Sequence, residues 1–199
     1  MKKKQLTLTD IIVTIMIAVV FAIVYRLWTP LYDIVSVTGL QLHQLIYGMW
    51  FIAGPLAMLI IRKPGIAILA QTAASVGSFL AGSPYGPLSL LLYGFFQGLG
   101  AELAFAMFRY RLYHMGVAIL GAIGASIASF SVDYFNDYLL DYTTWNLSIR
   151  VILRTVSAIL IAGVFATALV RALEKTGVVQ LIRPVSQADY ARLDAKRKQ

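Results

Sequence analysis

The sequence predicts an all-α integral membrane protein with six transmembrane helices in one bundle. Of the 199 residues, 59% are hydrophobic and only 13% are charged, and the mean hydropathy is +0.76. A soluble domain is about half apolar and about a quarter charged. About 20 apolar residues cross the hydrocarbon core. The segments that meet or approach this length are 11–28, 42–61, 66–82, 88–108, 115–132 and 151–170.

The first and third segments need separate arguments. Segment 11–28 follows a basic start, as in a signal peptide, but its apolar run is long and no small-residue cleavage site follows. We therefore predict that it is retained as a helix. Segment 66–82 is short and rich in small residues, which favours a place inside the bundle, where backbones approach closely. Together the six segments form one domain, residues 1–175, followed by a basic cytoplasmic tail, residues 176–199.

The basic residues predict the orientation. With the N-terminus inside, all but three of the 17 lysines and arginines lie on the inner side. The exceptions are Arg26, Arg150 and Arg154, at outer helix ends. Cytoplasmic segments carry an excess of Lys and Arg, so we expect both termini to be cytoplasmic and the protein to be a multi-pass component of a bacterial cytoplasmic membrane.

Catalytic and nucleotide-binding motifs are missing from the sequence. It has no cysteine, no G-x-x-x-x-G-K-[ST] and no G-x-S-x-G. His43 and His114 stand at opposite helix ends without ligand spacing. We therefore expect no enzyme activity, no cofactor and no metal site.

Glu102 is the carboxylate that most needs an explanation, because it lies within segment 88–108. A charge at the centre of a membrane helix costs roughly 2.5 kcal/mol or more. Tyr93 and Gln97 share one face of this helix, and Glu102 shares another with Phe95. Glu102 can neutralise a cationic ligand beside aromatic rings. Alternatively it is a structural group bonded to a polar side chain such as Gln71, or it is protonated in the bundle. Helix geometry places it in the inner half, about 10 Å along the axis from the end at residue 109.

Segment 42–61 carries a second group of polar and aromatic side chains. His43, Tyr47 and Trp50 recur on one helical face, and Gln44 flanks it. Two interpretations remain open at this point. Tyr and Trp are typical of an interfacial aromatic belt, whereas a pocket better explains Gln44, which gains nothing from facing lipid.

Two further patterns have weaker meanings on their own. Ala18 and Ala22 form a small-residue strip on which another helix can pack. The predicted outer loop 133–148 carries three Asp-Tyr pairs, which can be a solvated acidic loop or a lid that attracts cations. Arg150 and Arg154 lie one turn apart, and pairing with these aspartates is favoured over anion binding.

The combination of motifs resembles the YkoE family of substrate-capture (S) components of energy-coupling factor (ECF) vitamin transporters. The likeness spans residues 8–175, and three stretches carry it: RKPG at 62–65, GSPYG at 82–86 and QGLGAELAFAMFRYR at 97–111. The resemblance implies a ligand, thiamine or its hydroxymethylpyrimidine precursor. It also implies a membrane-embedded coupling (T) protein and cytoplasmic ATPases as partners.

The resemblance gives roles to residues already noted. It implies that Ala18 and Ala22 dock the coupling protein. A pocket for thiamine needs a carboxylate, aromatic faces and amide-like groups, and the candidates of these types are Glu102, Gln97, Tyr93, Tyr85, Tyr47, Trp50 and Gln44. The sequence lacks the internal repeat common in secondary transporters, which favours a capture subunit. The alternative is a structural or assembly subunit that binds no ligand.

Overall fold

The computed structural model describes residues 5–39, 41–140, 142–177 and 179, and within these ranges it contains helices and no strand. The chain makes six helical passes, two of them in more than one segment. The elements are α1 (Leu8–Ser36), η1 (Leu42–Phe51), α2 (Ala53–Ile61), α3 (Ile66–Leu80), α4 (Pro87–Met107), α5 (Met115–Phe135), α6 (Thr144–Ser157), η2 (Ala158–Phe165) and α7 (Ala166–Lys175).

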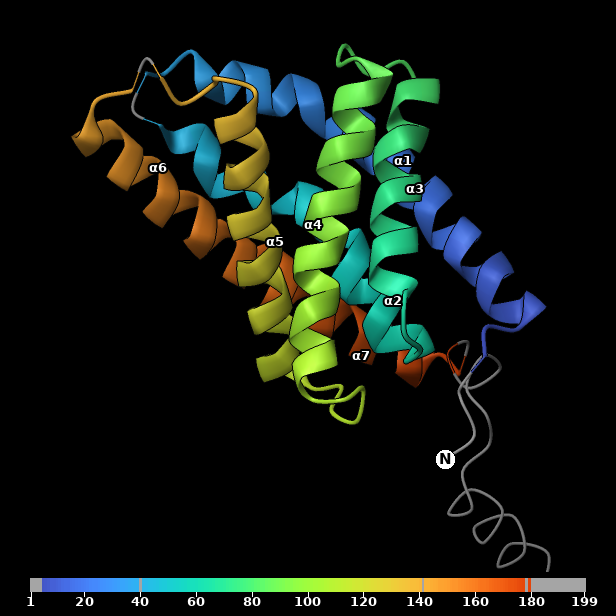
Figure 1. Ribbon diagram of the computed structural model, residues 1–199. Helices are drawn as coiled ribbons and strands as arrows, with labels where there is room; N and C mark the ends of the chain where they lie inside the picture. The colour runs from blue at the N-terminus through green and yellow to red at the C-terminus, as the bar shows by residue number, and fades with distance from the viewer. Residues whose placement is uncertain (1–4, 40, 141, 178, 180–199) are drawn as a thin grey trace, which may run out of the picture.

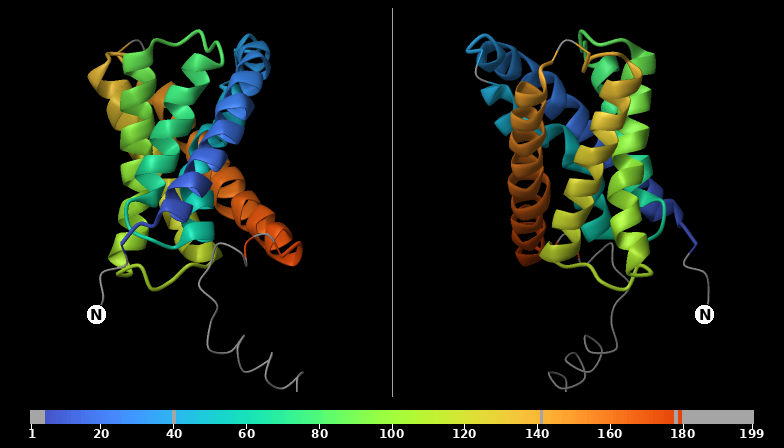
Figure 2. Two further views of the ribbon diagram at one scale, coloured as in Figure 1. Left: turned by 90° about the vertical axis from the view of Figure 1, so that its right-hand side faces the viewer. Right: turned by 60° about the vertical axis from the view of Figure 1, so that its left-hand side comes forward.

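The passes run between two ends of one bundle (Figures 1 and 2). Helices α3, α4 and α5 stand side by side, and α6, η2 and α7 follow one another as a single long rod, orange to red. The start of α1 and the end of α7 lie at the same end as residues 108–114, which we call the termini end. The connection at 81–86 and the connecting residues 136–140, 142 and 143 lie at the opposite end, which we call the loop end.

Five passes are long and apolar enough to cross a membrane, whereas α3 has 15 residues. The all-helical class is therefore confirmed, and six membrane crossings remain a prediction. Helix α3 packs between α1 and α4 (Figure 2). Of the predicted tail, only residues 176, 177 and 179 fall within the described residues.

Helix α1 is longer than predicted. It begins at a capping box in which the Thr7 side chain accepts from the Asp10 N–H and the Asp10 carboxylate accepts from the Thr7 N–H. It continues through Pro30 to Ser36, eight residues beyond the predicted end at residue 28. Pro30 has no N–H to give to the preceding turn, and there the Thr29 hydroxyl donates to the Tyr25 carbonyl.

The second pass has the predicted bounds but is not a uniform α-helix. It starts as the 3₁₀ segment η1 and becomes α-helical only at Ala53. Side chains of other helices satisfy backbone groups at the junction: Gln71 Oε1 accepts from the Gly54 N–H at 3.0 Å, and the Tyr25 hydroxyl accepts from the Ala53 N–H at 3.3 Å. Irregular backbone at membrane depth requires such partners.

Glycines set the closest helix contacts. A Cβ on Gly100 would stand 2.3 Å from the Gly124 carbonyl oxygen of α5, and one on Gly98 would stand 2.8 Å from the Ile68 Cα of α3. Backbones of α4 can therefore approach both neighbours closely, as small residues permit in membrane bundles.

The last pass starts seven residues earlier than predicted, because Thr143 caps it. The Thr143 side chain accepts from the Asn146 N–H. At Ser157 this pass meets η1: the Ser157 hydroxyl donates to the Leu45 carbonyl and accepts from the Gly48 N–H. This contact fixes η1 against α6, and α6 carries two arginines of the site below.

Candidate ligand-binding site

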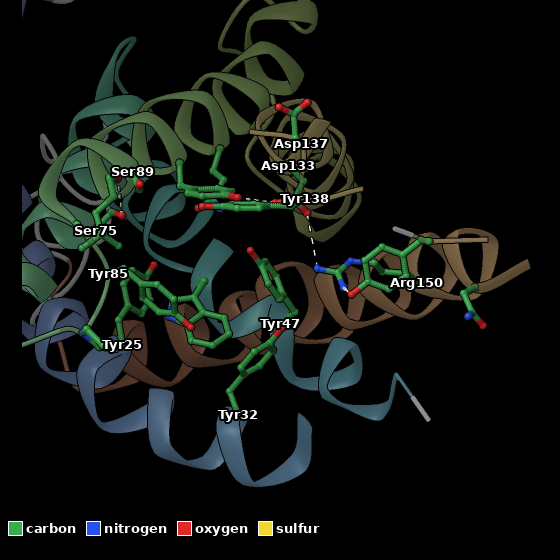
Figure 3. Close-up of a pocket in the computed structure, with 18 residues that line it drawn as sticks. Tyr25, Tyr32, Tyr47, Ser75, Tyr85, Ser89, Asp133, Asp137, Tyr138 and Arg150 are labelled. Carbon is green, nitrogen blue, oxygen red and sulfur yellow. Dashed lines mark hydrogen bonds and ion pairs between the residues drawn. The ribbon is translucent and has the colours of Figure 1, made fainter. Parts of the chain in front are cut away.

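A cavity of about 800 Å³ lies toward the loop end of the bundle (Figure 3). Aromatic side chains dominate its lining, with one arginine, two aspartates and a few small polar groups. The lining residues are Tyr25, Tyr32, Tyr47, Trp50, Ser75, Pro84, Tyr85, Gly86, Ser89, Leu90, Tyr93, Gln97, Asp133, Asp137, Tyr138, Tyr142, Asn146 and Arg150. Small-molecule sites are typically this large, with a mainly apolar lining and few polar groups.

The aromatic wall is built by α1 and η1. The Tyr32 ring lies edge-on to Trp50, with centroids 4.8 Å apart, and Tyr47 lies 5.2 Å from Trp50. Tyr85 adds a ring from the loop after α3, where burial and the nearby charge of Asp33 raise its pKa to about 12. Tyr85 is therefore a neutral hydrogen-bonding ring at physiological pH.

The deep end of the cavity contains an amide network. Gln97 Oε1 accepts from Gln71 Nε2 at 3.1 Å, and Gln71 Nε2 also donates to the Trp50 carbonyl. Gln71 Oε1 accepts from the Tyr25 hydroxyl at 3.3 Å. Tyr25, Trp50 and Gln97 line the cavity, so its floor is the same network that stabilises the break between η1 and α2.

Asp133 is the buried carboxylate of the cavity. Its Oδ2 accepts from Arg154 Nη1 at 2.7 Å and lies 3.9 Å from Arg150 Nη2. Its Oδ1 accepts from the Tyr93 hydroxyl. Asp133 and Arg150 lie together at one end of the cavity, away from Ser75 and Ser89 (Figure 3).

Arg154 lies behind Asp133 and is fully buried. Its guanidinium carbon lies 3.9 Å from the centroid of Tyr47 and 4.1 Å from that of Phe130. Its Nε donates to Gln44 Oε1 at 2.7 Å, and its Nη1 also donates to Ser129. These contacts confirm that the arginines of α6 pair with an aspartate of the preceding helix.

The arrangement suits a flat ligand with hydrogen-bonding edges. Tyrosine and tryptophan rings supply faces for stacking, and the same faces attract a positive charge. Amide and carboxylate groups at the two ends supply orientation. Among the described residues, no three His, Cys, Asp or Glu side chains are placed to hold a metal ion.

Comparison with known proteins identifies the family. Residues 9–128 match a family described as the permease component of ABC-type cobalt transport systems. The chain is also 35% identical over 177 residues, 88% of each chain, to a protein of Bacillus subtilis (strain 168) with the provisional name HMP/thiamine permease protein YkoE. This chain belongs to the YkoE family.

A solved structure agrees with this assignment. It is described as an S component of an ECF transporter, is 34% identical to this chain, and superposes with a TM-score of 0.85. The match covers 98% of this chain and 96% of that one. The YkoE-family chain is thus a multi-pass membrane transporter subunit of the S-component type, and not an enzyme.

The structure brings five of the predicted site residues of this YkoE-family chain together. Tyr47, Trp50, Tyr85, Tyr93 and Gln97 all line the cavity. Their contact with a ligand remains a proposal. The face of segment 42–61 that carries Tyr47 and Trp50 is directed into the protein at a cavity, which favours the pocket over the aromatic belt.

Gln44 lies outside the cavity lining. It is fully buried, its Oε1 accepts from Arg154 Nε, and its Nε2 donates to the Tyr32 hydroxyl at 3.3 Å. It therefore positions Arg154 and Tyr32.

Glu102 also lies outside the cavity, at the other end of α4. Its Oε1 accepts from the Gly65 N–H at 2.7 Å and its Oε2 from the Ala67 N–H at 2.9 Å. Gln71, considered as its partner, instead bonds Gln97. Glu102 caps the first turn of α3, where unpaired N–H groups favour an anion. This geometry supports the structural alternative for Glu102.

The strip of Ala18 and Ala22 is buried inside the chain. Both residues are no more than 6% exposed, and a Cβ on Gly77 of α3 would stand 2.9 Å from the Ala22 Cβ. The strip thus packs α1 against α3. Docking of a partner on Ala18 and Ala22 remains a prediction, and it would require these two helices to separate.

Several lining residues have no ligand role predicted from the sequence. Tyr25 lies in segment 11–28, for which only a membrane crossing was predicted. Tyr32 lies beyond the predicted end of that segment, and Asn146 lay in the predicted loop 133–148. Their spacing does hold a signal: Tyr25 and Tyr32 are seven residues apart, on one face of α1.

Proposed function

We propose that this protein captures thiamine, or its hydroxymethylpyrimidine precursor, from outside the cell for ATP-driven uptake. The observation that carries the proposal is the cavity at the loop end, in which tyrosines and Trp50 surround a deep amide and a buried carboxylate. The name of the Bacillus relative, an HMP/thiamine permease, supports the same ligand class.

The two ends of the cavity match the two parts of thiamine. At the floor, Gln97 Oε1 is taken by Gln71, which leaves the Gln97 amide nitrogen to donate to a pyrimidine ring nitrogen. At the other end, Asp133 and Asp137 supply negative charge for the thiazolium ring. In this proposal Tyr47, Trp50, Tyr85 and Tyr93 are the stacking and hydrogen-bonding wall between the two ends.

In the proposed topology the cavity lies toward the extracellular side of the membrane, and both termini lie in the cytoplasm. All described connections at the termini end carry basic residues, including Arg62, Lys63, Arg109 and Arg111, as expected for a cytoplasmic face. Uptake then requires a membrane-embedded coupling protein and cytoplasmic ATPases, because no nucleotide-binding motif occurs in this chain.

The capture function is tested by titrating the purified protein with thiamine and following tryptophan fluorescence. Of the three tryptophans, Trp50 lines the cavity, whereas Trp145 is 74% exposed and does not. We expect saturable quenching that Trp145→Phe retains and Trp50→Phe largely loses. A wild-type protein that shows no saturable response to either thiamine or hydroxymethylpyrimidine would instead favour a structural subunit.

A further inference from the structure

Asp133 has two arginine neighbours, and they are held in different ways. Arg154 donates a hydrogen bond to it at 2.7 Å, is fully buried, and is enclosed by the rings of Tyr47 and Phe130. Arg154 does not line the cavity. It is therefore a fixed partner that neutralises Asp133 from behind.

Arg150 is held loosely and from inside the cavity. Its Nη2 lies 3.9 Å from Asp133 Oδ2, beyond hydrogen-bond distance. Its Nη1 donates to the Tyr142 hydroxyl at 2.7 Å, and its guanidinium carbon lies 4.9 Å from the centroid of that ring. Its Nε is buried and has no hydrogen-bond partner among the described residues. Moving Arg150 therefore breaks one hydrogen bond, to the Tyr142 hydroxyl, together with the long ion pair to Asp133 and the contact with the Tyr142 ring.

The charged residues of the cavity lining, counted with Arg154, leave no net negative charge for a cation while Arg150 stays in place. Asp133 and Asp137 are the carboxylates in the lining, and Arg150 is the basic residue in it. Together with Arg154 behind the lining, two guanidinium groups balance these two carboxylates in number, and both guanidinium groups pair with Asp133. A cationic ligand would add a positive charge to a site already in balance, which is unfavourable at short range.

The contacts of Arg150 are those that an aromatic cation needs. A positive ring is stabilised by a carboxylate and by the face of an aromatic side chain, and Arg150 already lies between Asp133 and the Tyr142 ring. We propose that Arg150 occupies the cation subsite of the cavity and competes with a cationic ligand for Asp133 and Tyr142. Arg150 thereby sets the preference between cationic and neutral ligands. This inference rests on the proposed capture function.

The test measures the affinities of thiamine, a cation, and of hydroxymethylpyrimidine, which is neutral, on the full-length protein by calorimetry. Arg150→Gln removes the charge and keeps a hydrogen-bond donor. The ratio of thiamine affinity to hydroxymethylpyrimidine affinity should rise by about fivefold, which corresponds to about 1 kcal/mol, the upper end of the range for an exposed ion pair. Arg150→Met, which keeps an apolar stem against Tyr142, is the second uncharged variant should Arg150→Gln not fold.

Two control variants separate charge from other effects. Arg150→Lys keeps the positive charge and should leave the ratio close to the wild-type value. Arg26→Gln removes an arginine from the same end of the bundle but outside the cavity lining, and it should not change the ratio. A higher affinity ratio for both Arg150→Gln and Arg26→Gln would overturn the proposal. The effect would then depend on the net charge of the protein and not on the position of Arg150 in the cavity.

The outcomes keep this inference apart from the capture function. The wild-type protein can bind thiamine while the uncharged Arg150 variants show no higher ratio of thiamine affinity to hydroxymethylpyrimidine affinity. That result overturns the inference about Arg150 and leaves the capture function standing. A wild-type protein that binds neither compound, with an Arg150→Gln variant that binds thiamine, supports the inference and refutes capture by the wild type. If neither protein binds either compound, both the inference and the capture function are refuted.

Discussion

The carboxylate of Glu102 accepts a hydrogen bond from the backbone N–H of Ala67 at 2.9 Å, across the interface between α4 and α3. A second bond to the Gly65 N–H completes a cap that another helix supplies. Nearby, burial and the Glu102 charge raise the pKa of Tyr110 to about 12. The glutamate that looked like a ligand for a cation thus holds the start of α3.

Glu102→Gln should therefore affect stability and not ligand binding. Loss of the charge weakens two hydrogen bonds to the start of α3, at a cost of about 1–3 kcal/mol. We expect a lower thermal midpoint in detergent and a thiamine affinity within about twofold of the wild type. Glu174→Gln, which alters a half-exposed ion pair to Arg62, should shift the midpoint much less. A selective loss of thiamine binding in Glu102→Gln would contradict this assignment.

Asp133→Asn should be among the most destabilising single changes in the cavity. It removes the ionic partner of Arg154, a fully buried guanidinium, and breaking such a pair from one side costs about 3–5 kcal/mol. The matched control is Asp137→Asn, because Asp137 is exposed and has no described ion pair. Equal thermal midpoints for the two variants would argue against the buried pair.

Gly100→Ala should separate α4 from α5. The added Cβ would stand 2.3 Å from the Gly124 carbonyl oxygen, so backbones must shift, and overpacking costs about 1–3 kcal/mol or more. Gly86→Ala adds the same methyl group where no heavy atom lies within 4 Å and φ is −65°. The comparison uses thermal midpoints, and a lower midpoint for Gly86→Ala than for Gly100→Ala would refute the close contact.

Ala22→Trp should disrupt the fold, since Ala22 is packed against Gly77 of α3. Val20→Trp places the same ring on an exposed face of α1, where Val20 is 57% exposed. We expect loss of folded protein only for Ala22→Trp, as measured by size-exclusion chromatography in detergent. Normal folding of Ala22→Trp would show that the strip of Ala18 and Ala22 is not confined against α3, and would favour its role as a docking site.

Composition and hydropathy were sufficient to predict the fold class and the second pass, because membrane helices are long and uniformly apolar. The ends of α1 and α6 were not predictable in the same way. The predicted first segment ended at residue 28, yet α1 continues through Pro30 to Ser36. Thr143 starts α6 ahead of its apolar run, through a cap that hydropathy does not detect.

The residue types of the site could be predicted from the sequence, but which of these residues lie together in the structure could not. Tyr47, Trp50 and Gln97 were found because polar and aromatic groups in membrane helices are unusual. The role of Glu102 was not, because a carboxylate that caps another helix and one that binds a ligand have the same sequence pattern. Gln71 was noticed only as a partner for Glu102, whereas it lies at the centre of the cavity floor.

The position of Gln71 limits how this cavity can be redesigned. One side chain joins α1, the η1–α2 junction, α3 and α4 through Tyr25, Trp50, Gly54 and Gln97. A library that enlarges the floor would disturb all four elements at once. Substitutions at the mouth, such as Tyr85 and Tyr138, touch no such junction. The cavity is therefore more readily adapted to ligands that extend toward the loops than to ligands that are wider at the cavity floor.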